Sequence, residues 1–404
     1  MKRGFAAFAF CGVLLLGAGA AQASGLNGTS VWGTGGVSAQ MGGTGTARPL
    51  DSTSSVLRNP AGLSLQERPI ANLDFTWLRT DTNGDYEYPA ALGGPWEGQS
   101  NERNYPLFAT AIAYPLSQTS QLKGIPLSIG AGLDVSAGAG TDWVASPLGL
   151  KSLYLVFSGA VCASYKIGNL SIGAGPRVNF GLVDLGFGHH LDSDVGAQAG
   201  VIYSLEPWTF GASYISSIAL EFPRACDIDF DGVMDNLTIE EPHQVYFGIS
   251  YKGFEKWVFN AEGRWLNYGG ADFYKDIDWK DVWGGSFGVQ YALFPWLNVR
   301  AGYLYNTNPV EEHDGFDFGG FRDIQGHQMP NAVYEVMHLT CLPLFCMHHV
   351  GGGVGITIVD GLMINLGATY DFENTNEYKD STGTFSVKQD LSIITFDVGL
   401  QFTF

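Results

Sequence analysis

The segment "DLSIITFDVGLQFTF" (390–404) decides the fold class, because apolar and polar residues alternate along its second half without a break. The apolar members are Ile394, Phe396, Val398, Leu400, Phe402 and Phe404, and between them lie Thr395, Asp397, Gly399, Gln401 and Thr403. Successive side chains of a β-strand point to opposite faces, so this period predicts a strand with one apolar and one polar face.

Earlier segments repeat the alternation, at residues 170–182, 257–265, 297–303 and 364–371. A soluble β-sandwich with its apolar face turned inward would show the same period. A transmembrane barrel with its apolar face turned outward would show it too. Alternation alone leaves both folds open.

The spacing of the turns favours the barrel. Short turns are predicted at 166–169, 205–207, 252–256, 292–295 and 359–361, with a longer one near 117–124. Longer, more polar connections are predicted near 81–105, 138–152, 184–194, 221–241, 268–281, 307–347 and 375–388. These six short and seven long connections join fourteen strands. Short turns at one rim and long loops at the other are typical of a transmembrane barrel, whose long loops are extracellular.

Composition agrees with this class. The chain has 55 Gly, 26 Phe, 18 Tyr and 10 Trp, and only 15% of its residues are charged, which suits aromatic-girdled barrel strands. The formal net charge of −19 argues against nucleic-acid binding, which requires basic patches. After the N-terminal segment, no uncharged apolar run reaches about 18 residues, which argues against a helical membrane protein.

The N-terminus has the features of a signal peptide. Two basic residues precede an apolar segment, and Ala21-Gln22-Ala23 supplies the A-x-A pattern of a cleavage site. We therefore expect a signal peptide over 1–23. Residues 24–66 hold nine glycines and only three charged residues, so they do not form one regular strand. They are either a flexible leader or a plug inside a barrel formed by residues 67–404.

Four segments resemble the FadL/TodX family of outer-membrane transporters for long-chain fatty acids and aromatic hydrocarbons. "GTGTARPLDSTSSVLRNPAGLSL" (43–65) resembles the family's N-terminal segment, in which small residues lead to Asp, Ser/Thr and Asn-Pro-Ala. Residues 194–222, 242–310 and 348–372 resemble its strands, and the terminal Phe404 resembles the last residue of bacterial outer-membrane barrels.

The resemblance implies an all-β, transmembrane antiparallel barrel of fourteen strands, with an N-terminal hatch (24–66) that closes the lumen. It implies passive uptake of hydrophobic small molecules, which leave sideways through a gap in the wall near a kinked third strand. It also implies a monomer in the outer membrane, in contact with lipid and lipopolysaccharide. No cofactor is required for this function.

In the third strand, Gly130, Gly132, Gly138 and Gly140 suit a bulge that would form such a kink. Alternatively, these glycines only let strands pass closely.

The motif Asn59-Pro60-Ala61 is expected to be structural, because proline blocks sheet pairing and asparagine hydrogen-bonds turns. Ser24-Gly25-Leu26 resembles the start of fatty-acid members, whose third residue reaches the ligand pocket. Leu26 would do so here, or the tip would be disordered.

Lys280 matches a family lysine associated with the substrate carboxylate, although a lysine at an outer strand end is often only solvated. The family's partner arginine falls at Gly181, which cannot replace it. Arg177 lies on the same predicted lumen face and is the candidate substitute. This departure makes an uncharged aromatic or alkane substrate as credible as a fatty acid.

The loop "CDIDFDGVMDN" has acidic residues in the D-x-D-x-D-G spacing that wraps carboxylates around calcium: Asp227, Asp229, Asp231 and Asp235. The twelfth position is Thr238 rather than glutamate, and Glu240 or Glu241 could substitute for it. We expect a possible Ca²⁺ site over 227–241, the alternative being a solvated acidic loop. Cys341 and Cys346 are a candidate disulfide in the longest loop.

Two other functions compete with uptake by a channel. One is a calcium-dependent surface-binding barrel without transport. The other is an outer-membrane lipase or protease, which would need a Ser/His or Asp/His set at a strand end. All eight histidines fall in or beside predicted loops, and no serine motif accompanies them. The chain is therefore not expected to be an enzyme.

Overall fold

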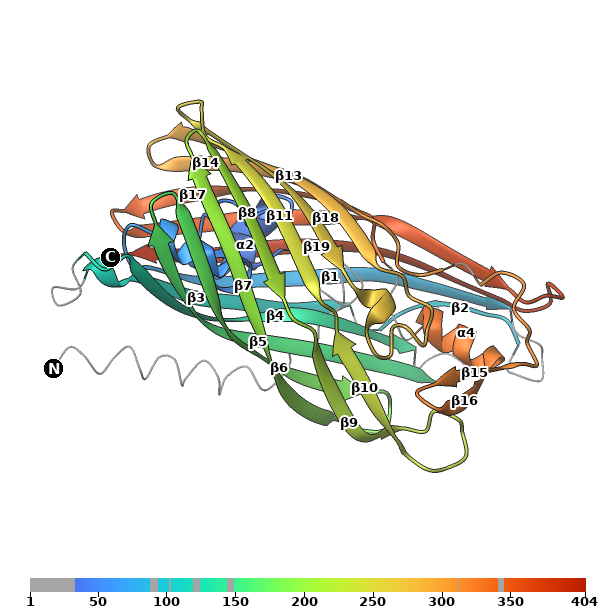
Figure 1. The fold of residues 1–404 in the computed structure, drawn as a ribbon. Coiled ribbons are helices and arrows are strands. Elements are labelled where there is room, and N and C mark those ends of the chain that lie inside the picture. The colour runs from blue at the N-terminus through green and yellow to red at the C-terminus, as the bar shows by residue number, and fades with distance from the viewer. Residues whose placement is uncertain are drawn as a thin grey trace.

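The structure is a computed structural model that describes residues 33–87, 94–101, 103–118, 124–143, 149–311, 313–340 and 345–404. Most of these residues form one antiparallel sheet, which closes on itself where β1 (Ile70–Glu87) pairs with β19 (Ser386–Thr403). The predicted barrel is therefore confirmed. An open sandwich is excluded, because the first and last strands are neighbours (Figure 1).

The other wall strands follow in chain order, each paired with the next. They are β3 (Asn104–Pro115), β4 (Leu127–Trp143), β5 (Leu150–Ile167), β6 (Leu170–Asp184), β7 (His190–Leu205), β8 (Trp208–Ile215), β11 (Gln244–Tyr251), β12 (Trp257–Leu266), β13 (Val282–Phe294), β14 (Leu297–Asn306), β17 (His348–Val359) and β18 (Leu362–Lys379). The short β2 (Trp96–Gln99) pairs with β1 beyond the point where the pairing of β3 with β1 ends. Counting β2 with β3, the described part of the chain has fourteen wall strands, as the turns predicted.

The two rims differ as expected. Short turns and the C-terminus lie at one end, on the left in Figure 1, which we call the short-turn end. The long connections lie at the other, the long-loop end, and carry their own elements. These are the hairpin β9 (Ile218–Cys226) and β10 (Asp235–Glu241), the hairpin β15 (Phe321–Ile324) and β16 (His327–Pro330), and the helix α4 (Asn331–Thr340). Among the described residues, no helix is long and apolar enough to cross a membrane.

The barrel is apolar outside and polar inside. On β19, Phe396, Val398 and Phe402 are 40–51% exposed, whereas the alternating Thr395 and Asp397 are only 3–4% exposed. The outward apolar band would be unstable in water and needs a bilayer to cover it. The wall is therefore built as a membrane-spanning barrel.

The described part of the hatch (33–66) lies inside the short-turn half of the lumen as three short helices: α2 (Gly35–Gln40), α3 (Ser52–Leu57) and the 3₁₀ helix η1 (Pro60–Leu65). Asp51 begins α3 by accepting a hydrogen bond from the Ser54 amide at 2.7 Å. Pro60 begins η1, where its missing N–H costs nothing. Small and polar residues therefore form compact turns that fit inside the barrel.

Glycines of the wall make room for the hatch. A Cβ atom at Gly302 would lie 2.1 Å from the Gly42 nitrogen, and one at Gly288 would lie 2.4 Å from the Met41 carbonyl oxygen. Hatch backbone lies similarly close to Gly173, Gly211 and Gly351. Part of the high glycine content thus lines the lumen where the hatch backbone touches the wall.

The long-loop half of the lumen is filled differently. The β9–β10 hairpin and the 268–281 connection pack their apolar side chains over inward residues of β4, β5 and β6. Leu220 and Phe222 of the hairpin are fully buried and would contact any side chain placed at Gly181. A side chain at position 181 would therefore clash with the hairpin.

Candidate functional site

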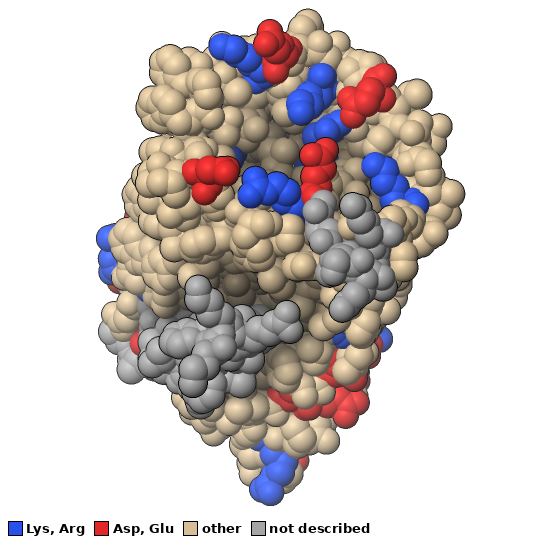
Figure 2. Space-filling view, turned by 90° about the vertical axis from the view of Figure 1, so that its left-hand side faces the viewer, with Lys and Arg blue, Asp and Glu red and all other residues tan. Residues whose placement is uncertain are grey.

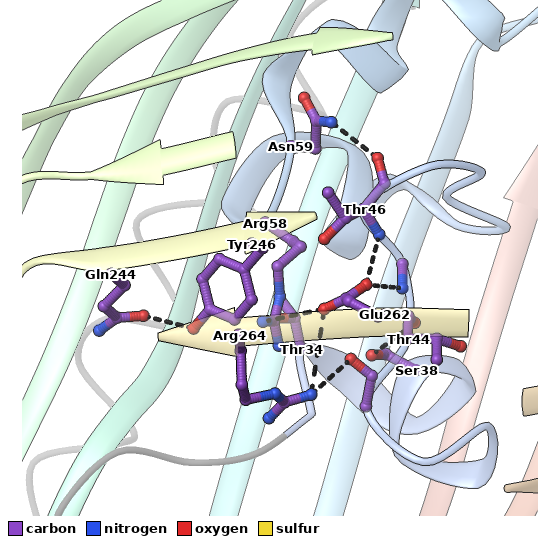
Figure 3. Close-up of polar contacts among 12 residues, drawn as sticks. Thr34, Ser38, Thr44, Thr46, Arg58, Asn59, Gln244, Tyr246, Glu262 and Arg264 are labelled. Carbon is purple, nitrogen blue, oxygen red and sulfur yellow. Dashed lines mark hydrogen bonds and ion pairs between the residues drawn. The ribbon is translucent and has the colours of Figure 1, made fainter. Parts of the chain in front are cut away.

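One buried carboxylate fixes the hatch to the barrel. Oε2 of Glu262 on β12 accepts hydrogen bonds from the amides of Gly45 (3.0 Å) and Thr46 (2.9 Å). Oε1 lies 3.6 Å from Nη1 of Arg58 and 3.9 Å from Nη2 of Arg264. All three charged side chains are at most 3% exposed. Figure 3 shows this anchor, with hatch and wall groups meeting at the carboxylate.

Neighbouring groups complete the anchor. The Arg58 guanidinium lies 4.0 Å from the centroid of the Tyr246 ring, a cation–π contact. Nη2 of Arg264 donates a hydrogen bond to the Gly43 carbonyl at 3.3 Å. No sequence motif singles out these charges. The one indication in the sequence is that Glu262 and Arg264 lie on the polar face of a barrel strand. A charge buried there requires a partner.

Asn59 is engaged with backbone on both sides. Its Nδ2 donates to the Thr46 carbonyl at 2.7 Å, and its Oδ1 accepts from the Ala61 amide at 3.1 Å. Nδ2 also lies 3.4 Å from carbonyls on β7 and β8. Together with Pro60, which begins η1, the motif joins the hatch to the wall.

Arg177 and Lys280 do not form one site. Arg177 is buried in the lumen, where Nη1 donates to the Leu57 carbonyl at 3.2 Å and Nη2 lies 3.9 Å from Oδ1 of Asp134. The Lys280 side chain is 65% exposed and forms an ion pair with Glu311. Both cations therefore already have partners, and Arg177 supports the hatch.

The wall is incomplete between β3 and β4. Among the described residues, their ladder ends at the pair Ala109 and Asp134 and includes neither 104–108 of β3 nor 135–143 of β4. The register of β4 against β5 shifts after Val135, which leaves Ser136 as an extra residue. A bulge bends its strand, so β4 departs from β3 here. We call the unpaired stretch (104–108 and 135–140) the wall window.

The irregularity falls within the expected segment but not at a glycine. Gly130 and Gly132 lie before it in regular pairing, and side chains at these positions would press on Leu63, Val56 and Leu57 of the hatch. Gly138 and Gly140 follow the bulge, in regular pairing with β5. The first two glycines therefore serve hatch packing.

Side chains close the wall window. The Tyr105 hydroxyl on β3 donates to the Gly140 carbonyl on β4 at 3.1 Å. The rings of Phe108 on β3 and Phe157 on β5 approach to 5.8 Å between centroids. Such contacts can part without breaking a backbone ladder.

A cavity of ≈ 40 Å³ lies between the hatch and the wall window. Its lining includes Gly33, Gly35 and Ala39 of the hatch, Leu107 and Phe108 of β3, and Val135 of β4. Apolar cavities that hold benzene measure roughly 150 Å³, so this one is closed to a substrate in the described conformation.

Two further cavities lie toward the ends. An open pocket of ≈ 410 Å³ at the short-turn end is lined by Arg48, Leu50 and Leu65 of the hatch region and by Lys252, Lys256 and Trp257 of the wall. Figure 2 looks onto this end, where basic and acidic side chains are interspersed. A cavity of ≈ 80 Å³ at the long-loop end is lined by Ile228 and Leu237, by Phe273 and Ile277, and by Met337 and His338 of α4, among others.

The acidic loop brings its carboxylates together. One carboxylate oxygen from each of Asp227, Asp229 and Asp231 lies within 4.8 Å of the other two. In a second set, one oxygen each of Asp229 and Asp235 and a ring nitrogen of His327 are equally close. Several of these oxygens accept backbone amides, such as Oδ2 of Asp227 from Gly232 at 3.0 Å. The calcium site stays a prediction.

Neither candidate for the missing twelfth ligand turns toward the loop. Glu240 accepts from the Asp272 amide at 3.0 Å, and Glu241 accepts from the Tyr154 hydroxyl at 2.8 Å. Any calcium ligands would therefore be oxygen atoms of the hairpin turn, because Ca²⁺ binds oxygen ligands.

Other candidates fall partly outside the described residues. Ser24, Leu26 and Cys341 lie there, so the expected ligand contact and the Cys341–Cys346 disulfide stay predictions. Cys346 is buried, and its Sγ lies 3.7 Å from the Leu391 carbonyl. Burial, with the carboxylates of Asp235 and Asp227, raises the pKa of the Cys226 thiol to about 12, so this thiol is unreactive at neutral pH.

Among the described residues, Ser217 is hydrogen-bonded to a histidine, His243. Oγ of Ser217 lies 3.3 Å from Nε2 of His243. Nδ1 of the same ring accepts the Ser217 amide at 3.1 Å, so the neutral ring carries its proton on Nε2. Nε2 therefore cannot accept the serine proton, and the pair lacks the geometry of an activated nucleophile.

No protein-family model matches the sequence, and no curated protein matches it significantly. Solved structures do. The Pseudomonas putida toluene transporter TodX is 18% identical, with a TM-score of 0.66, over 92% of this chain and 99% of that one. A Pseudomonas aeruginosa FadL homologue is 15% identical, with a TM-score of 0.67, over 93% and 99%.

The Ralstonia pickettii toluene transporter TbuX is 15% identical, with a TM-score of 0.63, over 92% of this chain and 99% of that one. These similarities cover nearly the whole chain, and TodX and TbuX are toluene transporters. The resemblance seen in the sequence is thus confirmed for the fold, which is that of the FadL and TodX barrels.

Proposed function

We propose that this protein is an outer-membrane channel for passive uptake of hydrophobic small molecules. The observation that carries the proposal is the wall window, which lies beside a hatch-plugged lumen and a cavity lined partly by apolar side chains. The apolar outer band supports the membrane location. The transport activity of the structurally similar proteins supports the substrate class.

The path runs through two cavities. A molecule enters the apolar cavity at the long-loop end, which faces the outside of the cell, because burial removes its surface from water. It then reaches the cavity behind the wall window as the hatch shifts. Parting of the Tyr105 and Phe108 contacts releases it sideways into the bilayer, where partition is downhill and needs no energy source.

The substrate is uncharged under this proposal. Gly181 is packed against Leu220 and Phe222, Arg177 is occupied by the hatch and Asp134, and Lys280 is paired at the surface. A fatty-acid carboxylate would have to displace one of these partners. An aromatic or alkane hydrocarbon makes no such demand.

Deleting Ser136 tests the window. The deletion removes the bulge, so β4 can continue its regular ladder with β3 and seal the wall. The measurement is uptake of radiolabelled toluene by cells with an intact lipopolysaccharide leaflet. We expect uptake to fall to the level of cells that lack the protein.

Deleting Leu293 is the matched control, because it removes another register shift, between Ala292 and Phe294 of β13, far from the window. This variant should keep wild-type uptake. Heat-modifiable migration on gels would show that both barrels fold. Undiminished uptake in the folded Ser136 deletion would refute lateral exit.

A further inference from the structure

Two hairpins at the long-loop end meet at a histidine and two aspartates. Asp229 and Asp235 belong to the β9–β10 hairpin, Asp229 in its turn and Asp235 at the start of β10. His327 is the first residue of β16 in the neighbouring hairpin. One carboxylate oxygen of each aspartate and one ring nitrogen of His327 lie within 4.8 Å of one another. The set therefore brings a nitrogen ligand from one hairpin to two oxygen ligands of another.

The distances suit a shared cation better than a direct ion pair. Nδ1 of His327 lies 3.5 Å from Oδ2 of Asp229 and 3.5 Å from Oδ1 of Asp235. A hydrogen bond from a charged nitrogen to a carboxylate is about 2.7–2.9 Å long, so both separations exceed a direct bond. In a tetrahedral site with bonds of about 2.0–2.2 Å, neighbouring ligand atoms lie about 3.3–3.6 Å apart. Both separations fall within this range.

Backbone amides orient the two carboxylates. Oδ2 of Asp235 accepts from the Ile228 amide at 2.9 Å, while Oδ1 faces His327. Oδ1 of Asp229 accepts from the Asp231 amide at 3.3 Å, while Oδ2 faces His327. Hydrogen bonds of this kind to the second atom of a ligand fix its direction in metal sites. One oxygen of each aspartate is therefore already aimed at the ring nitrogen.

The two hairpins are joined directly beside this set. The Thr238 amide on β10 donates to Oε1 of Gln325 at 3.0 Å, and Nε2 of Gln325 donates to the Thr238 carbonyl at 2.6 Å. Gln325 lies just before His327 in the chain, and Thr238 lies just after Asp235. The reciprocal bonds hold the imidazole and the carboxylates near each other without a metal. A cation would therefore find its ligands in place.

The donor atoms indicate zinc rather than calcium. Zn²⁺ accepts imidazole nitrogen together with carboxylate oxygen, whereas Ca²⁺ and Mg²⁺ take oxygen. The Asp235 side chain is 10% exposed, but those of His327 and Asp229 are 32% and 27% exposed. A cation can therefore enter from solvent, and a water can take the fourth position.

We propose that Asp229, Asp235 and His327 bind one Zn²⁺ ion, which clamps the β9–β10 hairpin to the β15–β16 hairpin. Both hairpins line the cavity at the long-loop end, with Leu237 from the first and Met329 from the second. The ion fixes these two sides of the cavity relative to each other. The clamp goes beyond the proposed uptake function and does not depend on it.

Isothermal titration calorimetry tests the site. The protein is purified without a polyhistidine tag, reconstituted in nanodiscs, stripped of metal and titrated with Zn²⁺ or Ca²⁺. We expect one Zn²⁺ ion to bind per chain, at least about tenfold more tightly than Ca²⁺, because imidazole nitrogen suits zinc and calcium prefers oxygen. Absence of Zn²⁺ binding, or Ca²⁺ binding of equal strength, would overturn the proposal.

Two variants each remove one ligand. His327→Leu and Asp235→Asn should both weaken Zn²⁺ binding by at least about tenfold, since the loss of a group that only orients a ligand already costs about 10–100-fold. Asparagine at 235 can still accept the Ile228 amide, so this variant keeps the hairpin turn. Heat-modifiable migration on gels would show that both barrels fold.

Two matched controls should keep the wild-type affinity. Asp227→Asn removes the same charge from the same turn, at an aspartate outside the set. His189→Leu removes another histidine of the long-loop end, which pairs with Asp184 and is 66% exposed. If Asp227→Asn weakens binding as much as Asp235→Asn does, the site consists of the acidic turn alone and the proposal fails.

Hydrogen exchange tests the clamp itself. Zn²⁺ at about ten times its Kd should slow amide exchange in both hairpins, 218–241 and 321–330, by up to about tenfold, because the ion binds only when they are together. His327→Leu should show no slowing. Slowing in one hairpin alone would refute the clamp. Zn²⁺ binding that survives in His327→Leu would place the ion elsewhere, for instance at His313, Glu335 and His338, and would overturn the assignment.

Discussion

The two halves of the lumen are filled by opposite means. At the short-turn end, the hatch is fixed by a few buried charges and by backbone contacts across glycines, with Glu262 at the centre. At the long-loop end, the β9–β10 hairpin, the 268–281 connection and α4 pack through many apolar side chains, Phe222 and Trp279 among them. A few specific bonds hold the plug in one position, whereas distributed apolar contacts can adjust around a ligand. The plug should therefore respond to single changes that the outer loops tolerate.

The largest expected effect is at the anchor. Glu262→Leu leaves Arg58 and Arg264 buried without their carboxylate, and we expect hatch docking to lose about 3–5 kcal/mol. Hydrogen exchange of the Gly45 and Thr46 amides measures this loss. The barrel should stay heat-modifiable.

Glu206→Gln is the control for the anchor, because Glu206 is 69% exposed in its ion pair with Arg48. Its effect should stay below about 1 kcal/mol. If the Gly45 and Thr46 amides exchange equally slowly in Glu262→Leu and in the wild type, the hatch is not held by this carboxylate. The two halves of the lumen would then not differ in how they are fixed.

The second-largest effect is expected at the glycines of the wall that touch the hatch backbone. Gly288→Val places a side chain against the Met41 carbonyl, which is backbone and cannot turn away, and should cost about 1–3 kcal/mol. Gly285→Val on the same strand is the control, because nothing lies within 4 Å of its Cβ position. Hatch protease sensitivity should rise only in the first variant.

The outer half should instead respond to pH. Because the pKa of His338 is lowered in the folded state, the unfolded state binds more protons below the usual histidine value. The stability of α4 should therefore fall as pH drops below 6.5, by up to about 1.4 kcal/mol per pH unit. Among the described residues, the charged or titratable groups near this ring are Arg322 on β15, His313, Glu335, Tyr334 and Tyr378.

Hydrogen exchange of α4 amides at pH 7.5 and 5.5, roughly one unit either side of that value, measures the pH effect. His338→Leu should flatten it. A wild-type profile equally flat would contradict the neutral buried histidine.

The smallest effect concerns the acidic loop. If calcium holds it, a chelator should increase protease cleavage within 227–235 in the wild type but not in Asp229→Ala, while the hatch is unaffected. Glu206→Gln, far from the loop, should respond as the wild type does. The same response to chelator in wild type and Asp229→Ala would end the calcium prediction.

Residue patterns alone predicted much of the architecture. The period of two along 390–404 predicted the last strand, and turn spacing predicted fourteen strands, because both depend on neighbours in the chain. The Asn-Pro pair at 59–60 indicated a structural junction for the same local reason. The acidic hairpin turn was also visible, since its spacing lies within one loop.

Only the tertiary structure decided what closes and opens the lumen. Glu262 meets the Gly45 amide across 217 residues, and the glycines that touch the hatch look like those that only turn the chain. The bulge at Ser136 is a mismatch between β4 and β5, which neither strand carries alone. The buried hydrogen bond from Trp279 to His338 likewise joins segments 59 residues apart in the chain. Local periodicity specifies strands, whereas anchors, windows and pockets arise from contacts between distant segments that form only when the barrel closes.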